Sequence, residues 1–406
     1  MNFWVARSFA AAAVVCQLAQ GEEITWQKSG PGLAMTRLTN SGPVIFSAVR
    51  IELDYLNKDL SLITTLASNQ VVGTEPLLSQ VRALPKELGT PVAAMNGDFF
   101  MMSGAAKGDP RGLHIWRGEL VSVPTGPAAF WQDANGKLHG EAVSSRFTVS
   151  WPGGGTNLSG LNEQLRTNSM VIFTPRMGRL NEDRTTTNSA NSSSGRSRNT
   201  ADTGIPQGGP IRPPGGREYI LEHSGTGPWL PLRVGHVYRA KVVASSNRLS
   251  AGKMMMMVGS NLLASVPEIT NGTPVTITAA TEPDLSGIQE ALGTGPMLVQ
   301  GGQPSEVTAR MSEQLHPRAA LGWNEKYLYL TTADGRQKEI SVGIKLAEMA
   351  DFMIELGCEE VINMDGGQST TLMLNGKIIN QQSSGLHAVA NGIVVLRKPT
   401  PENPDD

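Results

Sequence analysis

Short apolar runs separated by Gly, Pro and Asn dominate the hydrophobic pattern of this 406-residue chain. From about residue 24 to 123, runs such as VIFSAVRIEL and TPVAAMNGDFF have the length and the punctuation of β-strands. A second strand-rich stretch covers 147–173, and strand patterns return at REYILEH, VYRAKVVAS and PVTITAA. The methionines of KMMMMVGS could indicate metal or redox chemistry, but a fully buried strand needs only such apolar residues, and we predict core packing.

A helical pattern begins at Ser341 and ends at Gly357, where SVGIKLAEMADFMIELG carries apolar residues at helical spacing. Serine can cap the start of a helix and glycine its end. The segment stands between the strand patterns YLYLTT and EEVINM, which predicts a βαβ-like unit near the C-terminus. A hairpin turning at Asn375-Gly376 and a final strand, NGIVVL, should follow. The predicted fold class is therefore α/β, mixed α+β, with a mixed sheet in a single domain.

The first 21 residues have the pattern of a secretory signal peptide. Arg7 precedes a short apolar run, and small residues follow it up to Gly21, near which we expect cleavage. A buried N-terminal helix or a short anchor are the alternatives, although the run is too short to span a bilayer unaided. A lipid-anchored Cys16 is less favoured because Val14 and Val15 precede it. We predict a secreted or periplasmic, extracytoplasmic protein with no transmembrane helix once the signal is removed.

The remaining chain is expected to form one domain over residues 22–398, followed by a polar tail at 399–406. Residues 179–217 are rich in Ser, Thr, Asn, Gly and Pro and almost free of large apolar side chains. Such a stretch cannot build a core, so we predict a surface insertion, with an active-site lid as the alternative. Loss of Cys16 with the signal would leave Cys358 alone, unable to form an internal disulfide and expected to be a small buried side chain.

Charge and composition narrow the range of partners. The chain is 39% hydrophobic and 17% charged, with a formal net charge of -2, so it can bury a substantial core. It offers no basic stripe of the kind that binds nucleic acid, and we expect no nucleic-acid partner.

Four glycine-rich polar clusters follow or interrupt strand patterns. Loops of this kind converge on sites in α/β folds, although each cluster alone could be an ordinary turn or cap. The clusters are AMNGDFF at 94–100, LGTGPMLVQGG at 292–302, HPRAALGW at 316–323 and INMDGGQSTT at 362–371.

Taken together and in this order, these motifs resemble the phosphodiester glycosidase family over roughly residues 90–395. Two residues depart from the family pattern, because Asp98 stands where glycine is usual and Gln368 replaces a third glycine. Substrate shape near both loops could therefore differ. The matching elements are Asn96-Gly97-Asp98-Phe99-Phe100, Gly295-Pro296, Arg318-Ala319-Ala320-Leu321-Gly322, Asp334-Gly335-Arg336, Ala347-Glu348-Met349-Ala350 and Asn363-Met364-Asp365-Gly366-Gly367-Gln368-Ser369.

The resemblance implies a secreted glycosidase that hydrolyses a sugar-1-phosphodiester in a polysaccharide, cell-wall polymer or glycoconjugate. Such a site needs a carboxylate near the anomeric carbon and donors for the phosphate. Asp365 and Asp98 are the catalytic candidates, and Arg318 is the preferred phosphate ligand. The other candidate binding residues are Asn96, His316, Gly295, Asn363, Ser369 and the amides of Gly366 and Gly367.

Each role has a structural alternative, since Asp365 could cap a turn, Arg318 could form a buried ion pair and His316 could be structural. No HExxH motif or closely paired histidines occur, which disfavours a zinc hydrolase. A carboxylate-bound calcium or magnesium ion stays open. Two other functions also remain: a noncatalytic carbohydrate- or wall-binding protein, and a phosphodiesterase that cleaves the P–O bond.

Overall fold

The computed structural model describes most of the chain. The described residues are 24–40, 42–104, 106–178, 215–243, 252–266, 269–308 and 313–399. The expected signal peptide, positions 179–214 of the polar insertion and positions 400–406 of the tail lie outside them. Within the described part of the chain, no helix is long and apolar enough to cross a membrane.

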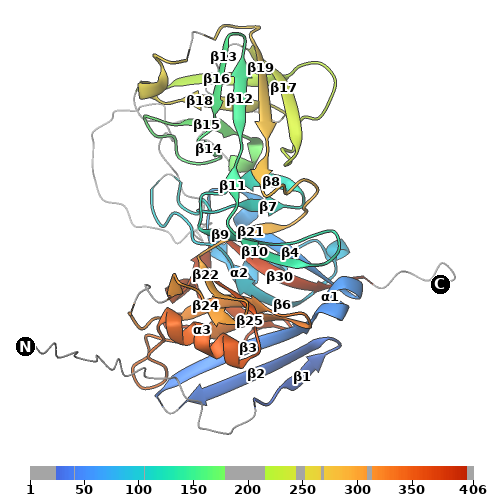
Figure 1. Cartoon of the computed structure of the whole chain (residues 1–406), viewed down its shortest axis with the longest axis vertical. Helices are drawn as coiled ribbons and strands as arrows, with labels where there is room; N and C mark the ends of the chain where they lie inside the picture. The colour runs from blue at the N-terminus through green and yellow to red at the C-terminus, as the bar shows by residue number, and fades with distance from the viewer. Residues whose placement is uncertain are drawn as a thin grey trace, which may run out of the picture.

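Two β-sheets packed face to face form the part of the molecule that carries the motif loops (Figure 1). Sheet 1 runs β1 (Gln27–Gly30), β2 (Leu33–Asn40), β3 (Val44–Glu52), β25 (Tyr327–Ala333), β24 (Arg318–Trp323), β26 (Glu360–Asn363), β22 (Met297–Gln300) and β23 (Gln303–Pro304). Sheet 2 runs β28 (Lys377–Ile378), β27 (Leu372–Leu374), β6 (Thr90–Asn96), β30 (Asn391–Arg397) and β4 (Leu60–Leu66).

Alternation along the central strands produces four layers, because successive side chains of a strand point to opposite faces. In β24, Leu321 packs between the two sheets, whereas Ala320 packs under helix α3 (Leu346–Glu355). In β30, Val395 packs between the sheets and Val394 packs under helix α2 (Leu77–Arg82). The order is therefore helix, sheet, sheet, helix, and the mixed α/β class is confirmed.

The predicted βαβ-like unit is β25, α3 and β26. Both strands pair antiparallel with β24, so they are parallel to each other and separated by one strand. The helix starts later than predicted, at Leu346, with the Lys345 amide N–H donating to the Glu348 carboxylate at 2.8 Å. Ser341 does not cap it, because its hydroxyl bonds the Asp334 carbonyl and the Ile45 amide instead. Gly357 follows the helix with a φ of 89°, as expected of a terminating glycine.

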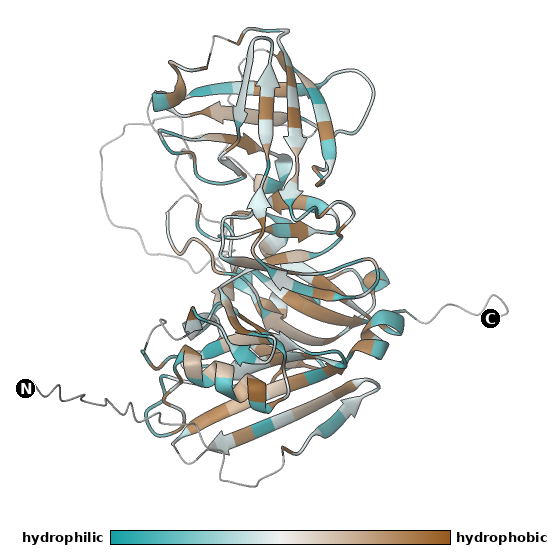
Figure 2. Ribbon diagram, in the orientation of Figure 1, coloured by the Kyte–Doolittle hydropathy of each residue, from teal (hydrophilic) through white to brown (hydrophobic). Residues whose placement is uncertain are grey.

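A second lobe, drawn at the top of Figure 1, consists of a further eight-stranded sheet, here called sheet 4. The smaller sheet 3 connects it to the first two sheets. The methionine run is β18 (Met254–Val258), fully buried inside this sheet, and its side chains alternate between two hydrophobic clusters. Core packing is thus confirmed, whereas neighbouring strands such as β17 alternate hydrophobic and hydrophilic residues (Figure 2). The other strands are β13 (Gly154–Asn157), β12 (Thr148–Trp151), β19 (Pro274–Ala279), β17 (His236–Val243), β16 (Arg217–His223), β15 (Met170–Phe173) and β14 (Gly160–Leu161).

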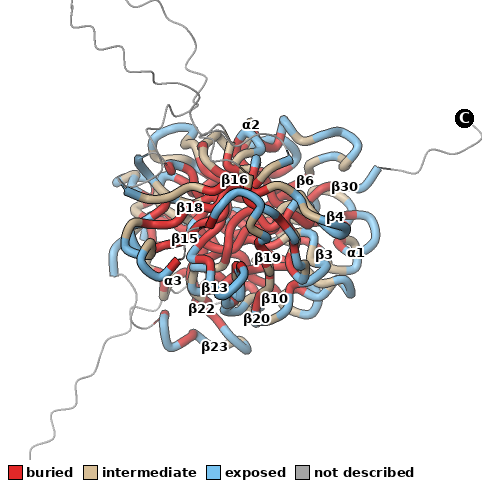
Figure 3. Tube along the Cα trace, turned by 90° about the horizontal axis from the view of Figure 1, so that it is seen from above, coloured by how far each residue is buried: buried red, intermediate tan, exposed pale blue. Residues whose placement is uncertain are grey.

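Sheet 3 lies between the lobes, and the chain leaves it for sheet 4 and returns through a ribbon of two paired strands. Buried residues of sheets 3 and 4 share one hydrophobic cluster, and buried positions concentrate in the strands (Figure 3). Sheet 3 contains β10 (Leu138–Glu141), β9 (Ala128–Gln132), β21 (Ala291–Thr294), β7 (His114–Trp116) and β8 (Glu119–Ser122), and the ribbon pairs β11 (Ser144–Ser145) with β20 (Thr281–Glu282).

The remaining elements are short. Asn375, with a φ of 47°, and Gly376 turn the predicted hairpin between β27 and β28, which is confirmed. Cys358 is buried under α3 as expected, and burial raises the pKa of its thiol. The hydrophobic pattern does not predict the six-residue helices α1 (Leu53–Lys58) and α2. The short pair β29 (Ala388–Val389) and β5 (Glu75–Pro76) completes the strands, and single 3-10 turns occupy Ala67–Asn69, Lys86–Leu88, Pro175–Met177, Ser260–Leu262 and Gly367–Ser369.

Candidate active site

Two motif loops meet where the facing sheets are joined. Strand β26 of sheet 1 continues through residues 364–371 into β27 of sheet 2, beside the end of β6. Asn96, the last residue of β6, is fully buried and holds both ends of this loop. Its Nδ2 donates to the Asp365 carbonyl at 2.7 Å, and its Oδ1 accepts from the Thr371 amide at 2.9 Å. The Asp365 amide in turn donates to the Gly97 carbonyl at 3.1 Å.

The Asp365 side chain is held in one orientation within this loop. The Ser369 side chain and the Gly366 amide donate hydrogen bonds to its carboxylate, and the positive charge of Arg111 lies nearby. All three favour the ionised form, yet burial disfavours it more strongly. The net result raises the pKa of Asp365 to about 6.

Asp98 is 3% exposed, and its carboxyl group lies against the Cα atoms of two glycines, Gly293 and Gly112. Its Oδ1 accepts from the Phe99 amide and its Oδ2 from the Gly112 amide, both at 2.7 Å. A methyl group added to Gly293 would lie 2.5 Å from Oδ2, and one added to Gly112 would lie 2.9 Å from it. Gly293 of the LGTG motif therefore allows this carboxyl group to lie close to the main chain.

Burial and the neighbouring Asp365 raise the pKa of Asp98 to about 7, against the two amide donors and the charge of Arg111. The two carboxyl groups thus interact electrostatically, and both interact with Arg111. Because the charge of Asp365 disfavours ionisation of Asp98, Asp98 holds its proton to a higher pH than Asp365 does.

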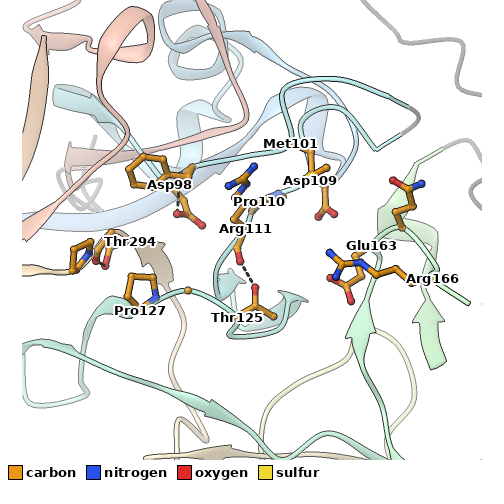
Figure 4. A pocket seen from close by; sticks show the side chains of 15 residues that line it. Asp98, Met101, Asp109, Pro110, Arg111, Thr125, Pro127, Glu163, Arg166 and Thr294 are labelled. Atoms are coloured by element: carbon orange, nitrogen blue, oxygen red, sulfur yellow. Dashed lines mark hydrogen bonds between the residues drawn. The ribbon is translucent and has the colours of Figure 1, made fainter. Parts of the chain in front are cut away.

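A cavity of about 650 Å³ opens in front of Asp98. Figure 4 shows Asp98 at one end, Glu163 and Arg166 at the other, and Arg111 and Asp109 between them. Its volume lies within the ~300–1,000 Å³ typical of small-molecule sites. The lining residues come from the loop after β6, the loop between β8 and β9, the loop after β14 in sheet 4 and the end of β21.

Arg318, the predicted phosphate ligand, lies outside the cavity lining, whereas Arg111 belongs to it. The Arg318 side chain is buried, its Nε donates to the Ile344 carbonyl at 3.2 Å and its Nη2 to the Gln314 carbonyl at 2.9 Å. It is not among the residues that line the cavity. Arg111 is exposed and lines the cavity, and no ion pair among the described residues uses its guanidinium.

His316 lies behind the DGGQS loop, away from the residues that line the cavity. Its Nδ1 is 3.4 Å from Arg336 Nη2, and burial together with Arg336 and Arg318 lowers the pKa of its imidazole. The Arg336 guanidinium lies against Gly367, since a methyl group there would be 3.1 Å from Nη2. His316 and Arg336 thus lie next to the DGGQS loop, outside the cavity lining.

The glycine amides expected to bind phosphate are already engaged inside the protein. The Gly366 N–H donates to the Asp365 carboxylate, and the Gly367 N–H donates to the Pro317 carbonyl at 2.8 Å. Gly295 is close to Asn363, because its amide donates to the Asn363 carbonyl at 2.8 Å. Of the residues predicted from the sequence, only Asp98 and Gly295 line the cavity directly.

Sequence reasoning missed Arg111, Asp109 and Glu163. The signal available for the first two was the segment GDPRG at 108–112, which concentrates opposite charges and turn residues between two apolar runs. No comparable signal marks Glu163. Among the described residues, no group of three or more His, Cys, Asp or Glu side chains is arranged to hold a metal ion.

Comparison with known proteins confirms the resemblance indicated by the motifs. Residues 235–396 match the family model described as phosphodiester glycosidase. This match contains Arg318 and Asp365, whereas Asn96, Asp98 and Arg111 precede it. It is therefore shorter than the stretch of about 90–395 that the motifs indicate.

Two curated relatives match at low coverage. Human N-acetylglucosamine-1-phosphodiester alpha-N-acetylglucosaminidase is 31% identical over 108 residues, which is 24% of this chain and 21% of the relative. The SPbeta prophage-derived uncharacterized protein YomE of Bacillus subtilis is 29% identical over 119 residues, 28% of this chain and 18% of the relative. The aligned part thus spans about one fifth of the length of these relatives.

Solved structures share the fold over most of the chain. A hypothetical protein from Synechocystis superposes with a TM-score of 0.65 at 16% identity, covering 93% of this chain and 64% of that one. A Burkholderia pseudomallei protein gives a TM-score of 0.60 at 18% identity, covering 88% of this chain and 75% of that one. At these identities the likeness concerns the fold.

Proposed function

We propose that this chain is a glycosidase that hydrolyses a sugar-1-phosphodiester, cleaving the bond between the anomeric carbon and the phosphate oxygen. One observation carries the proposal: buried Asp98 and partly buried Asp365 come from loops on facing sheets that are bonded to each other, and the charge of Arg111 acts on both carboxyl groups. The match of residues 235–396 to phosphodiester glycosidases supports the same chemistry.

The roles follow from charge. Arg111 binds the phosphate, because a guanidinium fork can make two charge-assisted hydrogen bonds to it. The bound phosphate then brings the anomeric carbon next to the two carboxyl groups. Asp365 in its ionised form acts as the general base for water or as the nucleophile.

Water ultimately supplies a hydroxyl group to the anomeric carbon and a proton to the solution or the leaving group. The C–O bond breaks, and its electron pair leaves with the phosphate monoester. This leaving group is already stable as an anion, so the reaction needs less acid assistance than hydrolysis of an ordinary glycoside. Protonated Asp98 can supply what assistance is required.

The two carboxyl groups predict the pH profile of this reaction. Asp365, with a pKa of about 6, must be ionised, while Asp98, with a pKa of about 7, retains its proton longer. A pair whose pKa values are separated in this way supports a bell-shaped profile with its maximum between those values. We therefore expect kcat/KM to peak at mildly acidic pH.

The deciding experiment offers the purified chain a panel of sugar-1-phosphodiesters beside the matching aryl glycosides and bis-aryl phosphates. The proposal requires hydrolysis of at least one sugar-1-phosphodiester, with oxygen-18 from labelled water appearing in the sugar hydroxyl. Label in the phosphate would show P–O cleavage and make the chain a phosphodiesterase. Binding of the diesters without turnover would make it a carbohydrate-binding protein.

Export is a separate part of the proposal. It rests on the order of Arg7, the apolar run and the small residues before Gly21. N-terminal sequencing of material recovered outside the cytoplasm should begin near residue 22. A protein that retains Met1 and stays in the cytoplasm would refute it.

A further inference from the structure

Two further acidic residues, Asp109 and Glu163, line the cavity on the side away from Asp98. Asp109 lies in the loop after β6, two residues before Arg111, and Glu163 lies after β14 in the second lobe. The two carboxyl groups are close enough for the charge of Glu163 to act on Asp109. Neither group has a role in the reaction described above.

Asp109 is a polar side chain that lacks a partner. It is 5% exposed, it lines the cavity, and its Oδ1 is buried without any hydrogen-bond donor. Buried acceptors are normally paired, so this carboxyl group is an unusual feature of a cavity wall. Because the Asp109 side chain lines the cavity, a ligand that brings a donor there can bond the carboxyl group.

Glu163 is positioned by close backbone contact. A methyl group added to Gly160 would collide with Glu163 Oε1, so the carboxyl group is folded over the Cα of this glycine. Glycine at this position thus lets Glu163 take the orientation seen in Figure 4, at the cavity wall beside Arg166.

The chemistry of the surroundings selects the kind of donor. Burial raises the pKa of Glu163 to about 7 and raises that of Asp109 well above its usual range, so the pair tends to keep protons. Arg111 and Arg166 line the same cavity and oppose the entry of a cation. The cavity therefore favours a neutral ligand that can bond protonated carboxyl groups. Hydroxyl groups are neutral and can both donate and accept hydrogen bonds.

We propose that Asp109 and Glu163 form a hydroxyl-binding subsite for a sugar or polyol, placed across Arg111 from the catalytic carboxyl groups. In the reaction proposed above, on which this role rests, the subsite receives the alcohol component of the phosphodiester. The substrate class is then a diester whose aglycone is a polyol or a second sugar. The second lobe contributes to specificity through Glu163.

Binding of free hydroxylated probes tests the subsite without requiring catalysis. Saturation-transfer NMR would measure the binding of glycerol, ribitol, D-glucose and D-mannose, at millimolar concentration, to the parent chain, Asp109→Leu, Glu163→Met and Gly160→Ala. Glu141→Gln, which alters an exposed carboxylate on β10, is the matched control. At least one probe should bind the parent and the control equally and each cavity variant about tenfold more weakly, as expected for loss of one hydrogen bond.

Unfolding in urea separates this role from a merely structural one. Because no described residue donates a hydrogen bond to Oδ1 of Asp109, Asp109→Leu breaks none there and should unfold at the same or a higher urea concentration than the parent. The proposal is overturned if no probe binds the parent, if the cavity variants bind as well as the parent, or if ethanolamine binds in preference to the neutral probes. Probe binding that depends on Asp109 without diester hydrolysis would retain the subsite and refute the proposed reaction.

Discussion

The Nδ2 atom of Asn96 donates a 2.7 Å hydrogen bond to the main-chain carbonyl of Asp365, although 269 positions separate these residues in the chain. The bond joins the end of a strand in sheet 2 to the loop that leaves sheet 1. Asn96 is fully buried, and both atoms of its side-chain amide are engaged with this loop. It acts as a positioning residue for the Asp365 loop.

Asn96→Asp should therefore uncouple the two loops. The variant keeps an acceptor for the Thr371 amide but places an acceptor opposite the Asp365 carbonyl. We expect the free energy of unfolding to fall by about 1–3 kcal/mol. Urea unfolding measures this loss, and kcat should drop more than KM rises, because the carboxylate is displaced while Arg111 is not. Unchanged stability would contradict the role given to this bond.

Asp365→Asn keeps the shape of the side chain and removes its charge. If the carboxylate acts in the transition state, kcat for a sugar-1-phosphodiester should fall roughly a hundredfold or more, with a smaller change in KM. Steady-state kinetics with the parent, Asp365→Asn and Glu359→Gln provide the test, since Glu359 is an exposed carboxylate outside the site. Parental turnover by a folded Asp365→Asn protein would exclude this residue from the chemistry.

Arg111→Lys and Arg318→Lys should have opposite consequences. The first keeps a charge in the cavity but loses the fork, so KM for the phosphodiester should rise about tenfold while stability is retained. The second loses hydrogen bonds to the Ile344 and Gln314 carbonyls, so it should lower the free energy of unfolding by about 1–2 kcal/mol. Kinetics and urea unfolding of both proteins separate the roles. A higher KM for Arg318→Lys alone would restore Arg318 as the phosphate ligand.

The folded protein should lose stability as the pH rises from about 4 to about 7. Asp98 and Asp365 have pKa values of about 7 and about 6 when folded, against 3.8 when unfolded. In this window the folded state holds protons that the unfolded state has released, so raising the pH favours unfolding. The slope is at most about 1.4 kcal/mol per pH unit for each group.

Urea unfolding at pH 5 and pH 8 measures this dependence. Asp98→Asn removes the group with the higher pKa, so the difference in stability between the two pH values should shrink. Asp284→Asn is a suitable control, because Asp284 is nearly fully exposed to solvent at the protein surface and its pKa is lowered. An equal difference in the parent and in Asp98→Asn would show that Asp98 ionises normally in the folded protein.

Local pattern was sufficient for the strands and for the loops that carry the motifs. The methionine strand β18, the Asn375-Gly376 turn and the helix ending at Gly357 depend on neighbouring residues and on the alternation of buried faces. Asp98 and Asp365 could be singled out because they follow apolar runs within glycine-rich motifs. The start of the helix could not be predicted in this way. The Ser341 hydroxyl does not cap the helix, because it accepts a hydrogen bond from the amide of Ile45, 296 positions away.

The sequence by itself thus determined the mixed α/β class, the resemblance to phosphodiester glycosidases and the two carboxyl groups. Only the tertiary structure decided which arginine faces the cavity, since Arg111 and Arg318 are chemically identical and differ in whether main-chain carbonyls surround them. It also brought Glu163, from a lobe built on other strands, beside Asp109. The sequence specifies the chemistry of each side chain. The burial of that side chain and its partners depend on segments that are distant in the chain and pack against it in the folded protein.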